Sequence, residues 1–174
     1  MEIPVIETER LILRAPRLSD FDAYVATRRS PEVYSLFGDA PPAAEDCWRR
    51  FITIQGHWAL MGFGYWLVEE RGTGGYVGEV GMADFRRVIE PSIEGTMEAG
   101  WILSPLVHGK GYATEAAQAA IAWGRAQFPG RGITCIISPG NATSLAVAHK
   151  CGFVTRCVTD YHGEPVLLLD WKGA

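Results

Sequence analysis

The segment from Thr96 to Phe153 constrains the fold more than any other part of the chain. It begins with a predicted strand, "TMEAGWILS", which runs into the glycine-flanked turn and alanine-rich helix of "LVHGKGYATEAAQAAIAWGRAQF". A short, almost wholly apolar strand, "ITCIIS", and another helix, "NATSLAVAHKCGF", follow. The composition of the first helix favours helix formation, and such an apolar run is typical of a strand buried on both faces. This succession indicates a mixed α/β domain in which a ligand site could form.

The remaining sequence adds strands and helices around this segment. The stretch "RLILRA" alternates like a strand, and "LSDFDAYVATRR" predicts a helix with Ser19 as N-cap and Leu18 on its apolar face. A further helix follows the turn residues of "GDAPPAAEDCWRRFITIQGHWALM", and a hairpin joins Tyr65–Glu70 to Tyr76–Phe85. The strands "VTRCVTDY" and "PVLLLDW" close the chain. We therefore expect one domain over residues 1–174, in the order β-α-α-β-β-β-α-β-α-β-β.

Composition narrows the classes of function. The chain has 174 residues, of which 48% are hydrophobic and 21% charged, an ordinary balance for a folded domain. Its net charge of -4 disfavours nucleic-acid binding as the main role. No apolar run approaches the roughly 18 residues of a membrane span, and "MEIPVIETER" lacks the pattern of a signal peptide. We expect no membrane partner and a cytoplasmic location.

The cysteines do not indicate a metal site. No pair among the four has C-x-x-C spacing. A zinc site would have to join His149, Cys151, Cys157 and His162, whose intervals match no common zinc pattern. We therefore expect no metal, and small reduced thiols instead.

The turn "HGKG" before the alanine-rich helix is a candidate anion site. A helix N-terminus presents unpaired N–H groups with partial positive charge, and glycines before it let a ligand approach the backbone. His108 and Lys110 could add positive charge. The pattern is neither a P-loop nor a dinucleotide fingerprint, so a plain turn stays open as the alternative on local sequence alone.

The longer motifs around this turn resemble the GNAT family of acyl-CoA-dependent N-acetyltransferases, and within it the RimJ/RimL-type branch. The stretches that carry the resemblance cover nearly the whole chain: "TERLILRAPRLSDFDAY", "YVGEVGM", "EAGWILSPLVHGKGYATEA" and "NATSLAVAHKCGF". The resemblance implies a central, mostly antiparallel twisted sheet of about six to seven strands with about four helices. It also implies acetyl-CoA as cosubstrate and an amine as acceptor, and homodimers are common in the family.

The resemblance assigns the residues that bind the cosubstrate. The family motif Q/R-x-x-G-x-G/A falls on His108, Gly111 and Ala113, with histidine in place of the usual glutamine or arginine. Backbone groups of the preceding strand would contact the pantetheine arm. Asn141 would also contact it, although an N-cap role for Asn141 is equally consistent with the sequence. Lys150 could meet the adenosine phosphates or lie on a solvated face. The residues implied are Trp101, Ile102 and Leu103 on the strand; His108, Gly109, Lys110, Gly111, Tyr112, Ala113 and Thr114 at the pyrophosphate; and Asn141 and Lys150.

The catalytic groups are less clearly marked. Glu98 is the first candidate base, with an exposed charge at a strand start as the alternative, and Glu79 is the second candidate. Many family members place a tyrosine on the last helix to protonate the leaving thiolate, and here that position is Ala148. Ser144, earlier on the same helix, is the candidate for hydrogen bonding to the thiol.

Two hypotheses about the function follow from these residues. The first is an acetyl-CoA-dependent N-acetyltransferase that modifies a protein N-terminal α-amine or a small-molecule amine by direct attack in a ternary complex. The alternative is a catalytically weak CoA- or acyl-CoA-binding module on the same fold, suggested by the missing tyrosine. Acidic residues such as Asp84 and Glu94 could attract a cationic amine. The aromatic residues Trp48, Phe51, Trp58 and Trp66 could line an acceptor pocket or belong to the core.

Overall fold

A sheet of eight strands runs through residues 2–173, the part of the chain that the computed structural model describes. The strands lie in the order β1-β2-β3-β4-β5-β6-β8-β7, and only the pairing of β5 with β6 is parallel. Their bounds are β1 (Ile6–Glu7), β2 (Leu11–Arg14), β3 (Tyr65–Glu70), β4 (Tyr76–Ala83), β5 (Met97–Leu103), β6 (Ile133–Ile137), β7 (Phe153–Tyr161) and β8 (Glu164–Trp171). The mostly antiparallel mixed α/β architecture predicted from the sequence is confirmed.

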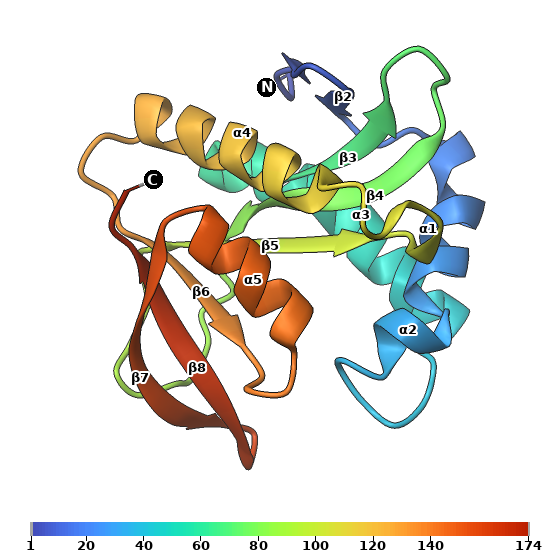
Figure 1. The fold of residues 1–174 in the computed structure, drawn as a ribbon. Helices are drawn as coiled ribbons and strands as arrows, with labels where there is room; N and C mark the ends of the chain where they lie inside the picture. The colour runs from blue at the N-terminus through green and yellow to red at the C-terminus, as the bar shows by residue number, and fades with distance from the viewer. Residues whose placement is uncertain (1, 174) are drawn as a thin grey trace.

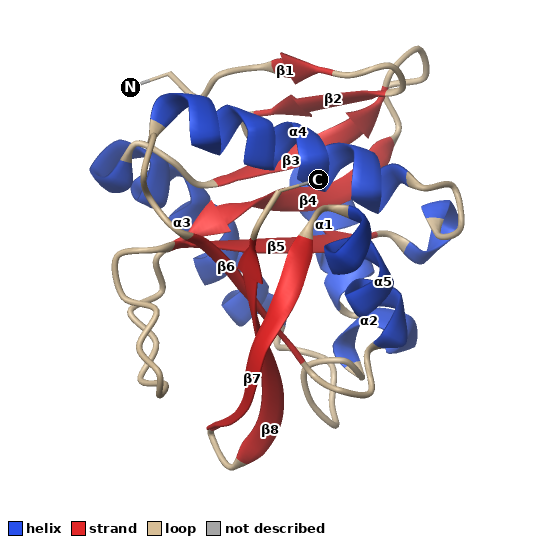
Figure 2. Ribbon diagram, turned by 60° about the vertical axis from the view of Figure 1, so that its left-hand side comes forward, coloured by secondary structure: helices blue, strands red, loops and turns tan. Residues whose placement is uncertain are grey.

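Helices cover both faces of this sheet (Figures 1 and 2). The helices α4 and α5 lie on one face, while α1 and α3 lie on the other. The α-helices are α1 (Phe21–Arg28), α2 (Pro31–Tyr34), α3 (Ala44–Met61), α4 (Tyr112–Gln127) and α5 (Ala142–Lys150), and two short 3-10 helices are η1 (Leu18–Asp20) and η2 (Pro105–Val107). Within residues 2–173, no helix combines the length and apolar character needed to cross a membrane.

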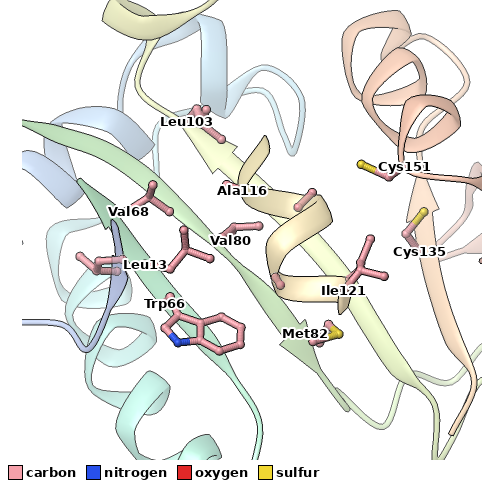
Figure 3. Close-up of a cluster of buried hydrophobic side chains, with 14 of the residues drawn as sticks. Leu13, Trp66, Val68, Val80, Met82, Leu103, Ala116, Ile121, Cys135 and Cys151 are labelled. Carbon is pink, nitrogen blue, oxygen red and sulfur yellow. The ribbon is translucent and has the colours of Figure 1, made fainter. Parts of the chain in front are cut away.

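The main core lies between α4 and the sheet (Figure 3). Small residues of α4, such as Ala116 and Ala120, are buried and allow the helix to approach the strands closely. The opposing strand residues include Leu13 and Trp66, each with no exposed surface, and Val80 of the central strand. The strand β4 is buried along nearly its whole length and pairs with β3 on one side and with β5 on the other.

The strand and helix counts exceed the expected ones by two short elements. The two-residue strand β1 pairs with β2, and the four-residue helix α2 follows α1. Pro31 follows the end of α1 and opens α2, at a position where a missing N–H costs nothing. Elements this short carry too little periodicity to be visible in the sequence.

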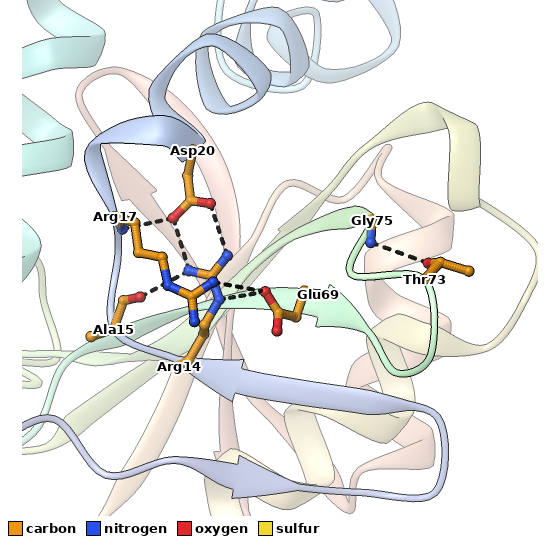
Figure 4. Close-up of polar contacts among 7 residues, drawn as sticks. All are labelled: Arg14, Ala15, Arg17, Asp20, Glu69, Thr73 and Gly75. Carbon is orange, nitrogen blue, oxygen red and sulfur yellow. Dashed lines mark hydrogen bonds and ion pairs between the residues drawn. The ribbon is translucent and has the colours of Figure 1, made fainter.

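The start of α1 also differs from the prediction. Ser19 lies inside η1 and is not the N-cap of α1, which begins at Phe21, and Leu18 is 75% exposed instead of facing the core. The cause is Asp20, whose carboxylate accepts hydrogen bonds from the Arg14 guanidinium and from the N–H of Arg17 (Figure 4). These bonds draw the chain into a tight turn before the helix begins.

The aromatic residues near α3 belong mostly to the core. Phe51, Trp58 and Trp66 are at most 4% exposed, so they form no wall of an open pocket. Trp48 is the exception, because 40% of it is exposed. Its ring makes an edge-to-face contact with the ring of Phe21.

Candidate active site

The parallel strands β5 and β6 separate near the centre of the sheet. They pair only at Met97 with Ile133 and at Glu98 with Thr134. Beyond these residues β5 stays paired with β4 as far as Leu103, whereas β6 continues beside β8. Figure 1 shows the two strands running apart. One edge of β5 beyond Glu98 therefore has no neighbouring strand.

The residues expected to meet the pantetheine arm lie along this edge. Trp101, Ile102 and Leu103 pair with β4 but not with β6. The carbonyl oxygen of Leu103 lies 3.1 Å from Nε2 of His108. Since a carbonyl only accepts hydrogen bonds, Nε2 carries the proton and donates it. His108 thus ties the turn to the end of β5, and one of its ring nitrogens is engaged by the protein itself.

Six consecutive backbone N–H groups are free where this turn enters α4. Within residues 2–173, the N–H groups of residues 109 to 114 donate no hydrogen bond, whereas His108 N–H donates to Pro105 and Glu115 N–H donates to Gly111. Gly111 is the N-cap of α4 with a φ of 78°, a left-handed conformation that glycine adopts without strain. Free donors at the positive end of a helix dipole suit a phosphate or diphosphate.

The side chains of Lys110 and Tyr112 turn toward Glu70 on β3. The Tyr112 hydroxyl donates to Oε1 of Glu70 at 2.5 Å, and Nζ of Lys110 lies 3.9 Å from the same oxygen. Tyr112 is only 7% exposed, so a ligand at the turn could reach its N–H but not its ring. The Lys110 side chain is 49% exposed and can reorient toward an anion.

Arg10 lies beside the turn, although sequence reasoning assigned it no role. Its Nη1 donates to the carbonyl oxygen of Lys110 at 2.9 Å, and its Nε donates to Oε2 of Glu115 at 2.7 Å. Burial of Glu115 favours its neutral form, but hydrogen bonds from Thr8 and Arg10 outweigh this and lower its pKa. The β1–β2 turn is therefore clamped to the first turn of α4. Arg10 precedes Lys110 by 100 residues, and nothing in the local pattern connects the two.

The helix α5 ends beside the first turn of α4, where Sγ of Cys151 lies 3.8 Å from the Thr114 carbonyl oxygen. The Asn141 side chain accepts a hydrogen bond from the Ser144 N–H at 3.0 Å, so Asn141 acts as the helix cap. The Ser144 hydroxyl makes no side-chain hydrogen bond among residues 2–173. Ala148 is fully buried, and Lys150 is exposed with its carbonyl oxygen facing Gln118 on α4.

Glu98 lies buried where β5 and β6 separate. Only 6% of the residue is exposed, so the alternative of an exposed charge at a strand start is wrong. Both of its oxygens accept from Arg87, at 2.6 Å from Nε and 2.7 Å from Nη2. Arg87 also donates to the Tyr161 hydroxyl at 2.9 Å. The loop between β4 and β5 and the end of β7 thus hold the carboxylate in place.

Glu79 occupies a similar environment on the neighbouring strand. It is 3% exposed and forms an ion pair with Nη2 of Arg28, which projects from α1. The Nε of Arg28 is buried and has no hydrogen-bond partner in the described part of the chain. The two candidate bases therefore face the α1 side of the sheet, each paired with an arginine that the sequence analysis did not single out.

Asp84 and Glu94 do not join this site. The Asp84 carboxylate accepts from the backbone N–H groups of Arg86 and Gly95, and Glu94 pairs with the Arg86 side chain at 2.5 Å. These contacts close the loop between β4 and β5. The two acids are engaged in shaping that loop, which leaves the earlier hypothesis of amine attraction without structural support.

The candidate zinc ligands are also not brought together. Across residues 2–173, the histidine, cysteine and acidic side chains form no group of three that could hold a metal ion. Cys135 and Cys151 are buried beneath α4 and α5, and burial raises the pKa of the Cys151 thiol to about 11.

Comparison with known families agrees with this architecture. Residues 10–154 match the family described as Acetyltransferase (GNAT) domain. The chain belongs to the GNAT family. A protein of Bordetella pertussis described as a GNAT-family acetyltransferase superposes with a TM-score of 0.85 at 27% identity, over 97% of this chain and 99% of that one. GNAT acetyltransferases use acetyl-CoA.

Two further relatives extend the comparison. YkkB of Bacillus subtilis (strain 168) is 32% identical over 113 residues, which span 64% of this chain and 62% of YkkB. The chain thus spans less than two thirds of the length of this curated relative. A RimL ribosomal L7/L12 α-N-protein acetyltransferase, solved in complex with coenzyme A, has a TM-score of 0.74 over 96% of this chain and 97% of that one. At 18% identity this likeness shows the fold alone.

Proposed function

We propose that this GNAT protein is an acetyl-CoA-dependent N-acetyltransferase that modifies a primary amine by direct attack in a ternary complex. The observation that carries the proposal is the run of six free N–H groups from residue 109 to residue 114, at the end of a strand with an open edge. The run suits a diphosphate, and the open edge suits an extended arm with amide groups. The residues present therefore fit acetyl-CoA, which supplies the activated acetyl thioester.

The proposed binding roles follow from these positions. The N–H groups of residues 109 to 114 would hold the diphosphate, each charge-assisted bond contributing roughly 1.5–3 kcal/mol. Backbone groups of Trp101, Ile102 and Leu103 would hold the pantetheine arm. Lys150 lies near the first turn of α4, because Cys151 is 3.8 Å from the Thr114 carbonyl oxygen, and it would meet the adenosine phosphates.

The paired carboxylates favour an acceptor amine of low pKa. An α-amine with a pKa near 8 needs about 1 kcal/mol to become neutral at pH 7, whereas a lysine-like amine needs about 4.6 kcal/mol. Glu98 and Glu79 already accept hydrogen bonds from Arg87 and Arg28, so a proton taken up by either carboxylate would compete with an arginine. We therefore propose an α-amine acceptor, consistent with the relative named as an α-N-protein acetyltransferase. Before attack, the α-ammonium would lose its first proton through water to a lone pair of Glu98 that Arg87 leaves unused.

Calorimetric titration with acetyl-CoA, followed by a thiol-release assay with an amine panel, tests the proposal. The panel contains peptides with free α-amines, amino acids, polyamines and aminoglycosides. We expect acetyl-CoA to bind and α-amine peptides to give the fastest thiol release. Failure of acetyl-CoA to bind would overturn the proposal. Binding without thiol release from any amine would instead support the acyl-CoA-binding module, for which the buried Ala148 is the one favourable feature.

Asn141 offers a smaller test that separates capping from ligand binding. Asn141→Ala is expected to lower the free energy of unfolding by about 1 kcal/mol, because the first turn of α5 loses its cap. Asn141→Ser keeps a capping oxygen but loses the amide NH2, so stability should be retained. If the amide contacts pantetheine, the serine variant will bind acetyl-CoA more weakly in calorimetry. Unchanged affinity would leave Asn141 with the cap as its only role.

A further inference from the structure

A row of three residues crosses the sheet and ends at the unpaired edge of β5. Tyr65 on β3 pairs with Gly81 on β4, and Gly81 pairs with Gly100 on β5. Residues directly opposite each other on antiparallel strands point to the same face. The two glycines leave a track without side chains, and the Tyr65 side chain lies along it. A methyl group on Gly100 would come within 2.2 Å of the Tyr65 hydroxyl oxygen, so this hydroxyl ends over β5, two strands from its own backbone.

The position of this hydroxyl coincides with the start of the unpaired edge of β5. Gly100 comes two residues after Glu98, the last β5 residue that pairs with β6. Glu98 and Glu79 lie on the same face of the sheet as this row. Each of them is two residues away from a glycine of the row on its own strand, and residues two apart on a strand point to the same face. An acyl group held along the open edge of β5 would therefore lie next to the Tyr65 hydroxyl, with the acceptor amine arriving from the side of α1.

The Tyr65 hydroxyl is chemically available. Among residues 2–173 it makes no hydrogen bond, and it is not one of the buried polar atoms left without a partner. Burial, and then the negative charges of Glu98 and Glu79, raise the pKa of Tyr65 above its ordinary value. The phenol therefore stays protonated at neutral pH. The helix α5 offers no better donor: Ala148 has no proton to give, and Ser144 lies on the first turn of that helix.

We propose that Tyr65 is a catalytic residue that carries a proton from the attacking amine to the departing sulfur, an inference that rests on the proposed acetyl transfer. The amine nitrogen forms a bond to the acetyl carbonyl carbon, and the carbon–sulfur bond then breaks. The Tyr65 oxygen accepts one proton from the nitrogen while its own proton passes to the thiolate sulfur. The phenol is regenerated, and no other proton donor or oxidant is required. Arg87 and Arg28 pair with the two carboxylates beside it, and the negative charges of these carboxylates disfavour the phenolate form of Tyr65.

The variant Tyr65→Phe tests this role, with Tyr76→Phe as the matched control. Both remove one hydroxyl from a half-buried strand tyrosine on the same face of the sheet. We expect Tyr65→Phe to lower kcat for the best amine at least tenfold, since a positioned proton donor contributes roughly 100-fold or more. The acetyl-CoA Kd and the amine KM should change less than twofold, and the solvent deuterium isotope effect on kcat should change. Tyr76→Phe should keep the wild-type kcat.

Three results would contradict the assignment. A Tyr65→Phe kcat within twofold of wild type would overturn it, and so would a Ser144→Ala variant that loses activity when Tyr65→Phe does not. Equal losses in kcat for Tyr65→Phe and Tyr76→Phe would show a general packing effect and would also overturn it. If the wild-type protein releases no thiol with any amine, the proposed function fails and this inference fails with it. That result is recognised from the wild-type protein alone, before any variant is compared.

Discussion

Gly111→Asp is expected to weaken acetyl-CoA binding about 30-fold relative to Gly111→Asn. Aspartate and asparagine have nearly the same shape, and both tolerate the left-handed conformation that residue 111 adopts at φ 78° better than most residues do. They differ in one negative charge placed among the free N–H groups of residues 109 to 114. Repulsion from a diphosphate at this distance amounts to about 2–3 kcal/mol near a protein surface, and 1.4 kcal/mol is tenfold in Kd.

Arg10 is expected to reduce the loss of acetyl-CoA affinity in Gly111→Asp. Its Nη2 lies 3.6 Å from the position of a Cβ at residue 111, so it would partly neutralise a new aspartate. Calorimetry at two salt concentrations measures the remaining charge effect, which should decrease at high salt. Thermal unfolding of the two variants should agree, since the strain at residue 111 is common to both. Equal Kd values for the two variants would place the diphosphate away from the start of α4.

The start of α4 could be predicted because its determinants are local. The glycines, the following helix formers and the strand before them occupy about 30 consecutive residues, and each acts through its neighbours in sequence. The hairpin of β3 and β4 was predicted for the same reason, with β3 ending at Glu70 as expected. Short elements such as β1 are formed by pairing with a distant strand, and no local signal announces them.

The polar partners of the site could not be predicted, because the fold alone brings them together. Arg28 precedes Glu79 by 51 residues, and Arg10 precedes Glu115 by 105. The relation of Tyr65 to Gly100 depends on the register of two strand pairings, which a one-residue slip would destroy. Most glutamates are exposed, so residue type alone does not predict that Glu98 is buried. Its carboxylate is paired with Arg87, which comes from the loop between β4 and β5.

Arg14→Met is expected to lower the free energy of unfolding by about 3–5 kcal/mol at pH 7. Arg14 is 7% exposed and binds Asp20 through two hydrogen bonds of 2.8 Å, while its Nε donates to Glu69 at 2.5 Å (Figure 4). Methionine fills similar volume but leaves two poorly solvated carboxylates without their cation. Urea unfolding measures the loss, and Arg49→Met on the exposed face of α3 is the control, expected to change stability by less than about 1 kcal/mol.

The pH dependence identifies the cause of this loss. Burial of Asp20 opposes its ionisation, but hydrogen bonds from Arg14 and Arg17 outweigh burial and lower its pKa below the ordinary value. A lowered pKa means that the stabilisation is fully present above the unfolded-state pKa of about 3.9 and is lost as pH falls through the folded-state pKa. In Arg14→Met the same carboxyl accepts a proton readily, because its cation is gone. The difference in unfolding free energy between wild type and Arg14→Met should therefore shrink between pH 7 and pH 3. A difference that stays constant over this range would assign the loss to packing of the Arg14 side chain instead of its charge.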